Sequence, residues 1–348
     1  MACATWVFFS VQGCVEIDDE SGRVKQTVLG SISSYYYLKY TTVALFNAEL
    51  HDVDEGPTEL PTLLRVLCDA SEFDELPVRH NEEHVNAQMA RELPWRVDEK
   101  ACDSPHVKAQ LLLQAHFARA ALPMSDYITD TKSVLDQALR VLNAMVDVAS
   151  DGGWLYTALG GMHLAQMITQ GCWQDDNGLG DLPHMDDRAI EQLRRQGVTS
   201  RRQLLDAKQE TLKGWLGGRN GLRDKQISEL HQLLRTLPNV RVHAEPPPPL
   251  APGAEGVVTV MLEALHNSRS KAFAPRYPKP RPAGWWLVMG EEEELLALKK
   301  VRIERGSTSA ELQFEAPEEP GEYTWSVLLV SDSYVGHDQR VEVRIVVQ

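Results

Sequence analysis

Four polar residues in the segment 131–150 have the types and spacing needed to contact an extended polar ligand. They recur at steps of four, three and four residues: Asp136, Arg140, Asn143 and Asp147. A helix would hold them within about 60° of one another. The remaining positions are mostly apolar, so protein would enclose this helix and leave one narrow polar strip. Either the strip faces solvent, with Asp136 and Arg140 as an ion pair, or it lines a channel whose donors reach bases or sugars.

The sequence contains none of the motifs that mark the common catalytic sites. It has no GxxxxGK[ST] phosphate loop, no HExxH segment and no GxSxG segment, the patterns of nucleotide hydrolysis, zinc peptidases and serine hydrolases. The eleven histidines are scattered, and none forms a ligand pair at i and i+4 on one helix. We therefore expect no metal and no cofactor, and we favour a binding or scaffolding module over an enzyme.

The composition indicates a multidomain chain of a reducing compartment. Its 348 residues, 43% of them hydrophobic, can fill two or three domain cores. No apolar run approaches the roughly 18 to 20 residues that a bilayer requires. The five cysteines form no CxxC pair, which is typical of the cytosol or nucleus.

The charge disfavours a general nucleic-acid binder but leaves one exception. The chain carries a formal charge of −15, whereas nucleic-acid binding relies on clustered Lys and Arg. Residues 179–240 differ, because eleven Lys/Arg against eight Asp/Glu give them a net +3. Only this segment is expected to attract phosphate, and only mildly.

Hydrophobic periodicity predicts an α+β multidomain fold. Helical spacing continues to about residue 178, which predicts an all-helical bundle over 31–178. Shorter helices with a hairpin signal follow over 179–240. Residues 241–256 contain a proline-rich stretch that we interpret as a linker. Six or seven short segments of period two then predict an antiparallel β-sandwich over 257–348.

The tyrosines of GSISSYYYLKYTTVALF, residues 30–46, would suit a membrane belt, a base-stacking platform or a buried helix. Apolar residues recur from Ile32 to Leu50 at three- and four-residue steps, so we predict a helix with Tyr36 and Tyr40 on its apolar stripe. The tyrosines are therefore expected to pack in the bundle core, with hydroxyl groups reaching polar partners at its edge.

Two features of the predicted sandwich suggest specific roles. Trp285 and Trp286 are adjacent on a strand, so their rings should point to opposite faces; one would lie in the core and the other would be a surface anchor for a protein partner. Asp332 and Asp338 should fix the turn in SDSYVGHDQ through bonds to the backbone. A calcium site there is the alternative.

Seven sequence blocks occur in a fixed order along the chain: LGSISSYYYLKYTTVALF, ELPVRHNEE, SPHVKAQLLLQAHFAR, GWLYTALGGMHLAQMITQGCW, LPHMD, GWWLVMG and SDSYVGHDQ. Together they resemble the Sec63 unit of the giant DExH-box helicases, from about Cys14 to Gln348. The set is most similar to the carboxyl-terminal unit of the spliceosomal helicase that unwinds the paired small nuclear RNAs.

This resemblance implies a helical bundle, a helix-hairpin-helix domain and an immunoglobulin-like or fibronectin-like sandwich. It makes residues 1–30 the remnant of a preceding winged-helix domain. Segment 131–150 takes the place of the family's ratchet helix, which touches translocating RNA. Arg140, Asn143 and Asp147 thereby become candidate RNA contacts.

The implied function is that of a non-catalytic, helicase-associated module in the nucleus. It would dock spliceosomal proteins and regulate a helicase core, in cis or in trans, during pre-mRNA splicing, with weak RNA contact and no membrane association. The alternative is an RNA-contacting part of an active ATP-dependent helicase, in splicing or in an activator or ribosome-rescue complex.

One departure from the family pattern bears on RNA binding. A phosphate-binding helix-hairpin-helix places glycines in its hairpin so that backbone amides can approach phosphate, but residues 183–186 read PHMD. The candidate phosphate contacts are the nearby arginines Arg194, Arg195, Arg201 and Arg202. The alternative is a small packing domain with a basic surface.

Overall fold

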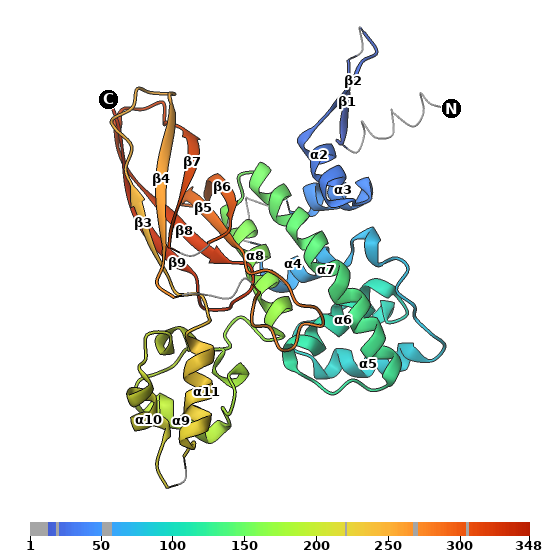
Figure 1. Ribbon diagram of the computed structural model, residues 1–348. Helices are drawn as coiled ribbons and strands as arrows, with labels where there is room; N and C mark the ends of the chain where they lie inside the picture. The colour runs from blue at the N-terminus through green and yellow to red at the C-terminus, as the bar shows by residue number, and fades with distance from the viewer. Residues whose placement is uncertain (1–12, 19–20, 51–57, 220, 267–270, 304–305) are drawn as a thin grey trace. The chain divides into compact units, whose positions relative to one another are not determined.

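A computed structural model describes residues 13–18, 21–50, 58–219, 221–266, 271–303 and 306–348. It divides into two compact units. One contains the chain up to Trp173 together with Glu293–Leu295, and the other contains Gln174–Glu292 and Leu296–Gln348. Helices come first along the chain and antiparallel sheets follow (Figure 1), so the predicted α+β class is confirmed.

The first unit is a helical bundle built around one long helix. α7 is 27 residues long, and 13 of them are buried, because α2, α3, α4, α6 and α8 all pack against it (Figure 1). A short antiparallel pair, β1 and β2, precedes the helices. The elements are β1 (Val15–Ile17), β2 (Val24–Gln26), α2 (Val28–Tyr36), α3 (Tyr40–Glu49), α4 (Leu60–Cys68), α5 (Glu82–Glu92), α6 (Pro105–Ala118), α7 (Ser125–Asp151) and α8 (Leu155–Gln170). Residues 1–12 and 19–20 of the predicted winged-helix remnant lie outside the described residues.

The helix predicted from Ile32 to Leu50 is broken in two. α2 ends at Tyr36, and Tyr37 has a left-handed backbone with φ of 51°. Tyr35 is 75% exposed and Tyr37 is 89% exposed, so the prediction that the tyrosines pack in the core is wrong for these two. Consecutive helical residues point about 100° apart, and only Tyr36 of the three can therefore face α7.

The second unit begins with short helices whose apolar faces meet in a small leucine-rich core. They are η3 (Leu179–Asp181), α9 (Asp187–Arg195), η4 (Arg201–Leu204), α10 (Gln209–Leu216) and α11 (Asp224–Leu234). On α11 the buried residues are Ile227, Leu230, Leu233 and Leu234. Their spacing fixes one face of α11 against the core and leaves the other face to solvent.

Two antiparallel sheets follow, with strand orders β3-β4-β7 and β6-β5-β8-β9. Inward-facing residues of both sheets form one core that contains Trp285 and Trp325. The strands are β3 (Val240–Glu245), β4 (Glu255–Ala264), β5 (Trp285–Glu291), β6 (Glu294–Val301), β7 (Ser307–Glu315), β8 (Gly321–Ser331) and β9 (Gln339–Val347).

The predicted linker 241–256 is wrong at both ends. Residues 241–245 belong to β3, which pairs with β4 from Val240↔Ala264 to Glu245↔Thr259, and β4 itself begins at Glu255. The strand pattern of β3 is short, because Val240, Val242 and Ala244 alternate with polar residues over only six positions. The prolines that follow it directly made the whole stretch look like a linker. The turn prediction is confirmed for Asp338, whose Oδ1 accepts from Ser331 N at 2.9 Å. It is wrong for Asp332, whose Oδ1 accepts from Gly284 N, outside the turn, at 2.9 Å.

Within the described ranges, no helix is both long enough and apolar enough to cross a bilayer.

A buried ionic network joins α5, α6 and α7 of the bundle. The Lys108 side chain on α6 has no exposed surface, and its Nζ donates to Glu82 Oε2 at 2.6 Å and to Asp130 Oδ2 at 2.7 Å. It also donates to the Pro77 carbonyl at 2.6 Å. Arg79 bonds the same two carboxylates, at 3.0 Å and 2.7 Å. The network therefore pairs every charge that it buries, as a low-dielectric interior demands.

We expect Lys108→Met to destabilise the chain by about 3–5 kcal/mol, because it leaves two buried carboxylates with Arg79 alone. Urea unfolding followed by circular dichroism measures this loss. Lys39→Met is the control, since Lys39 pairs with Asp74 at 3.2 Å in an exposed position where a cost below about 1 kcal/mol is expected. Equal losses in the two variants would contradict the assignment.

The network also predicts acid sensitivity. Burial opposes ionisation of Glu82 and Asp130, but hydrogen bonds from Lys108 and Arg79 outweigh it and lower both pKa values below their ordinary 4.5 and 3.8. Their stabilisation is therefore complete above the ordinary values and is lost as pH falls through the lower, folded-state values. The urea midpoint should drop from about pH 4.5 downward, and less steeply in Lys108→Met. A wild-type midpoint that stays flat in acid would disprove this.

Candidate nucleic-acid and partner interface

The polar strip of α7 faces α2. Arg140 is half-buried, and its Nη1 donates to the carbonyl oxygens of Tyr36 and Tyr37, each at 2.7 Å. These two carbonyls stand at the carboxyl end of α2, where helical partners are lacking and the helix dipole is negative. Arg140 thus closes the end of α2 with charge-assisted hydrogen bonds.

A second contact of the strip holds the same short helix. Tyr36 Oη donates to Asp147 Oδ2 at 2.6 Å. Burial first, and then this hydrogen bond and the negative charge of Asp147, raise the pKa of Tyr36. The hydroxyl is therefore protonated at neutral pH and donates this hydrogen bond.

The strip is consequently not an open channel wall over these positions. Asn143 is half-buried and donates from Nδ2 to the Leu139 carbonyl of its own helix at 2.6 Å. Arg140 and Asp147 are both engaged with α2. Arg140 fits neither interpretation of the strip, the solvent-facing ion pair or the ligand channel. It holds α2 against α7 instead. An RNA contact by Arg140, Asn143 or Asp147 stays a prediction.

Of the four arginines predicted to contact phosphate near the hairpin, three are exposed and one is buried. Arg194 and Arg195 on α9 are exposed, and Arg195 pairs with Glu191 at 3.3 Å. Arg202 is exposed and donates to the Asp338 carbonyl at 2.8 Å. These three keep a surface that a phosphate could reach.

Arg201 cannot be a surface phosphate contact. Its side chain is 1% exposed and lies over the Tyr334 ring, 5.1 Å from the centroid, in a cation–π contact. Its Nε donates to His337 Nε2 at 3.3 Å. Burial first, and then the positive charges of Arg201 and Arg202, lower the pKa of His337 well below its usual range. The imidazole therefore stays neutral and can accept this bond.

The PHMD hairpin uses a non-glycine residue in a left-handed position. His184 has φ of 65°, and its Nε2 lies 2.7 Å from Glu229 Oε2. Asp186 caps α9 by accepting from Ala189 N at 2.8 Å. Two carboxylates, Glu229 and Asp186, thus border the hairpin. Their negative charge disfavours an approaching phosphate, and the absence of glycine hinders its close approach to the backbone.

Both tryptophans of the predicted partner anchor are buried. Trp285 is 5% exposed and Trp286 is 2% exposed. The prediction that one ring is a surface anchor is therefore wrong for this structure. Trp285 belongs to the sandwich core and Trp286 does not, as strand alternation predicts, but alternation alone does not tell whether the outer face of a sheet is covered.

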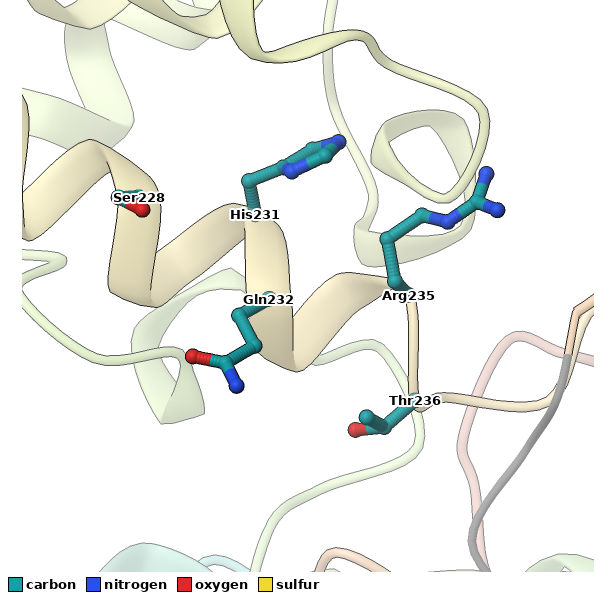
Figure 2. A pocket seen from close by; sticks show the side chains of 5 residues that line it. All are labelled: Ser228, His231, Gln232, Arg235 and Thr236. Carbon is teal, nitrogen blue, oxygen red and sulfur yellow. The ribbon is translucent and has the colours of Figure 1, made fainter.

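Sequence reasoning missed one cavity, on the solvent face of α11. It is an open surface hollow of about 520 Å³, lined by Ser228, His231 and Gln232 of α11 and by Arg235 and Thr236, which follow it (Figure 2). The signal was available, because these residues recur at steps of three, one, three and one, the spacing of one helix face. Among the described residues, no cluster of His, Cys, Asp and Glu has the arrangement of a metal site.

Comparison with known protein families identifies the family to which this chain belongs. Residues 26–344 match the family described as the Sec63 Brl domain. The chain belongs to this family. The expected resemblance to the Sec63 unit of large DExH-box helicases is thereby confirmed at the level of the family.

The Sec63 domain is similar to segments of several much longer proteins. It is 39% identical to the DExH-box ATP-dependent RNA helicase DExH14 of Arabidopsis thaliana over 94% of this chain and 15% of that protein. It is 37% identical to human activating signal cointegrator 1 complex subunit 3, over 95% of this chain and 17% of that protein. It is 33% identical to the human U5 small nuclear ribonucleoprotein 200 kDa helicase, over 94% of this chain and 15% of that protein.

These identities revise one expectation. The U5 small nuclear ribonucleoprotein 200 kDa helicase is a relative, but DExH14 and the cointegrator complex subunit are more similar to this Sec63 domain than it is. The chain spans about one sixth of the length of these relatives. Among solved structures, a CARDB domain from Pyrococcus furiosus covers 32% of this chain and 90% of its own, at 10% identity and a TM-score of 0.24.

We expect Arg140→Ala to lower the free energy of unfolding by about 1–3 kcal/mol, because it leaves the carbonyl end of α2 without its charged donor. Asn143→Ala is the matched control on the same strip, since the Asn143 side chain donates to a carbonyl of its own helix and its loss should cost less. Urea unfolding and hydrogen exchange at α2 measure both variants. Undiminished stability of Arg140→Ala would contradict the docking role.

Proposed function

We propose that this Sec63 domain is a non-catalytic module that docks protein partners and regulates a DExH-box helicase core, in cis or in trans, with RNA contact secondary. The observation that carries the proposal is the family match over residues 26–344, within segments of relatives that are named as helicases. The engagement of Arg140 and Asp147 with α2 supports it, because those side chains serve the bundle itself.

The finer assignment concerns the assembly that the module serves. A role in pre-mRNA splicing, with spliceosomal partners in the nucleus, rests on the 33% identity to the U5 small nuclear ribonucleoprotein 200 kDa helicase. The second candidate is a helicase of the activating signal cointegrator type, in which the domain contacts RNA during ATP-driven unwinding. The 37% identity to that complex subunit favours this candidate.

Immunoprecipitation from native extract with an antibody to the β-sandwich separates these assignments. We expect the antibody to recover a helicase polypeptide, either as the chain that carries the domain or as its partner. Companion U5 ribonucleoprotein components would support the splicing role, and companion cointegrator subunits would support the second candidate. A 39.0 kDa chain recovered without any DExH-box ATPase would overturn the proposed function.

A further inference from the structure

Four consecutive prolines lie in the connection from β3 to β4. This proline tract, Pro246–Pro249, follows the last residue of β3, Glu245, and precedes Leu250. Proline fixes φ near −65°, and a residue that precedes a proline is driven out of the helical region. The backbone of the tract is therefore confined to the extended polyproline II conformation before any partner binds.

The tract is attached to the sandwich at both ends. Glu245 pairs with Thr259 of β4. Leu250 N donates to the Val346 carbonyl at 2.9 Å, and the Leu250 carbonyl accepts from Gln348 N at 2.9 Å. The tract thus lies at the end of the sandwich that carries the C-terminus (Figure 1). Because a stiff, tethered segment has little conformational freedom to lose, it is preorganised for binding.

The burial of the tract follows a period of three residues, which is the period of a polyproline II helix. Pro247 and Leu250, three positions apart, are half-buried, and Leu250 packs against the sandwich core. Pro246, Pro248 and Pro249 are exposed. One edge of the three-sided helix therefore rests on the sandwich, and the other two edges face solvent.

The tract offers hydrogen-bond acceptors and no donors. Proline has no backbone N–H, and among the described residues no hydrogen bond reaches the carbonyl oxygens of Pro246–Pro249. A partner must therefore bring donors as well as apolar surface for the pyrrolidine rings. Grooves lined by Trp and Tyr bring both, because their faces pack on the rings while the indole N–H and phenolic O–H donate.

The residues around the tract discriminate among the domains that bind such helices. An SH3 groove places carboxylates against a basic residue beside the prolines, but residues 242–266 contain no Lys or Arg. An EVH1 groove takes up an aromatic residue of its ligand, but residues 240–270 contain no Phe, Tyr or Trp. The exposed carboxylates of Glu245 and Glu255 border the tract instead, which favours a groove with a basic rim.

We propose that the proline tract is the docking site for a WW domain whose groove has a basic rim. Pro248 and Pro249 lie on the two free edges and pack against the Trp and Tyr of that groove, and the carbonyl oxygens of the tract accept their hydrogen bonds. This inference rests on the proposed function only in that it names a protein partner for the docking module. The site is separate from the α7 strip and from the PHMD hairpin.

Isothermal titration calorimetry tests the proposal, with a purified WW domain whose groove is flanked by Lys and Arg and the intact 348-residue chain. The double variant Pro248→Ala/Pro249→Ala should weaken binding at least fivefold, because it removes the two rings that fill the groove. Glu245→Gln should weaken binding about twofold at low salt and leave it unchanged at high salt, where the rim charges are screened. Wild-type affinity in the double variant would overturn the proposal.

Pro278→Ala/Pro280→Ala is the matched control. Both prolines are exposed in a second proline-rich segment, residues 275–282, in which single prolines alternate with other residues. This double variant should alter affinity less than twofold, and thermal unfolding should show that all variants are folded. Equal losses in the two double variants would overturn the proposal, because any exposed proline would then serve.

The probe itself supplies a second test. A WW domain in which alanine replaces the groove tryptophan should not bind the chain, and undiminished binding would place the contact outside the groove and overturn the proposal. Tighter binding of an SH3 or EVH1 domain than of the WW domain would overturn the choice of partner. Since only purified components are used, docking can fail here while the antibody still recovers a helicase from extract, so this inference and the proposed function fail distinguishably.

Discussion

The helical bundle depends on a lysine ammonium that has no access to water. Lys108 reaches two carboxylates from two different helices and one backbone carbonyl. Arg79 donates to the second oxygen of each carboxylate, Glu82 Oε1 and Asp130 Oδ1. Removing a charge from water costs several kcal/mol unless partners replace the solvent. Only a packing that brings α5, α6 and α7 to these positions supplies every partner, so the network selects one arrangement of the three helices.

The same principle explains how α7 can carry polar residues while packing on most of its sides. Arg140 satisfies the carbonyl end of α2, and Asp147 receives the Tyr36 hydroxyl. Each polar group thereby serves a neighbouring element that would otherwise lack a partner. A strip used in this way holds α2 against α7. It also leaves fewer donors on α7 for an RNA strand.

In the second unit, α11 packs by one face and leaves the other to solvent. The leucine face of α11 joins the small core, while polar side chains, among them Ser228, His231 and Gln232, lie on its exposed side.

Local regularities in the sequence determined the fold class. Helical spacing marked the bundle, period two marked six of the strands, and the acidic residues of SDSYVGHDQ marked a turn, because each rule joins residues only a few positions apart. Tertiary packing alone decided which polar side chains are available. Arg140 meets the Tyr36 carbonyl across 104 positions and Arg201 meets His337 across 136, and no local pattern encodes such pairs. Whether a sheet face or a tyrosine is covered likewise depends on what packs over it, so Trp286, Tyr35 and Arg201 were misplaced while the elements that carry them were found.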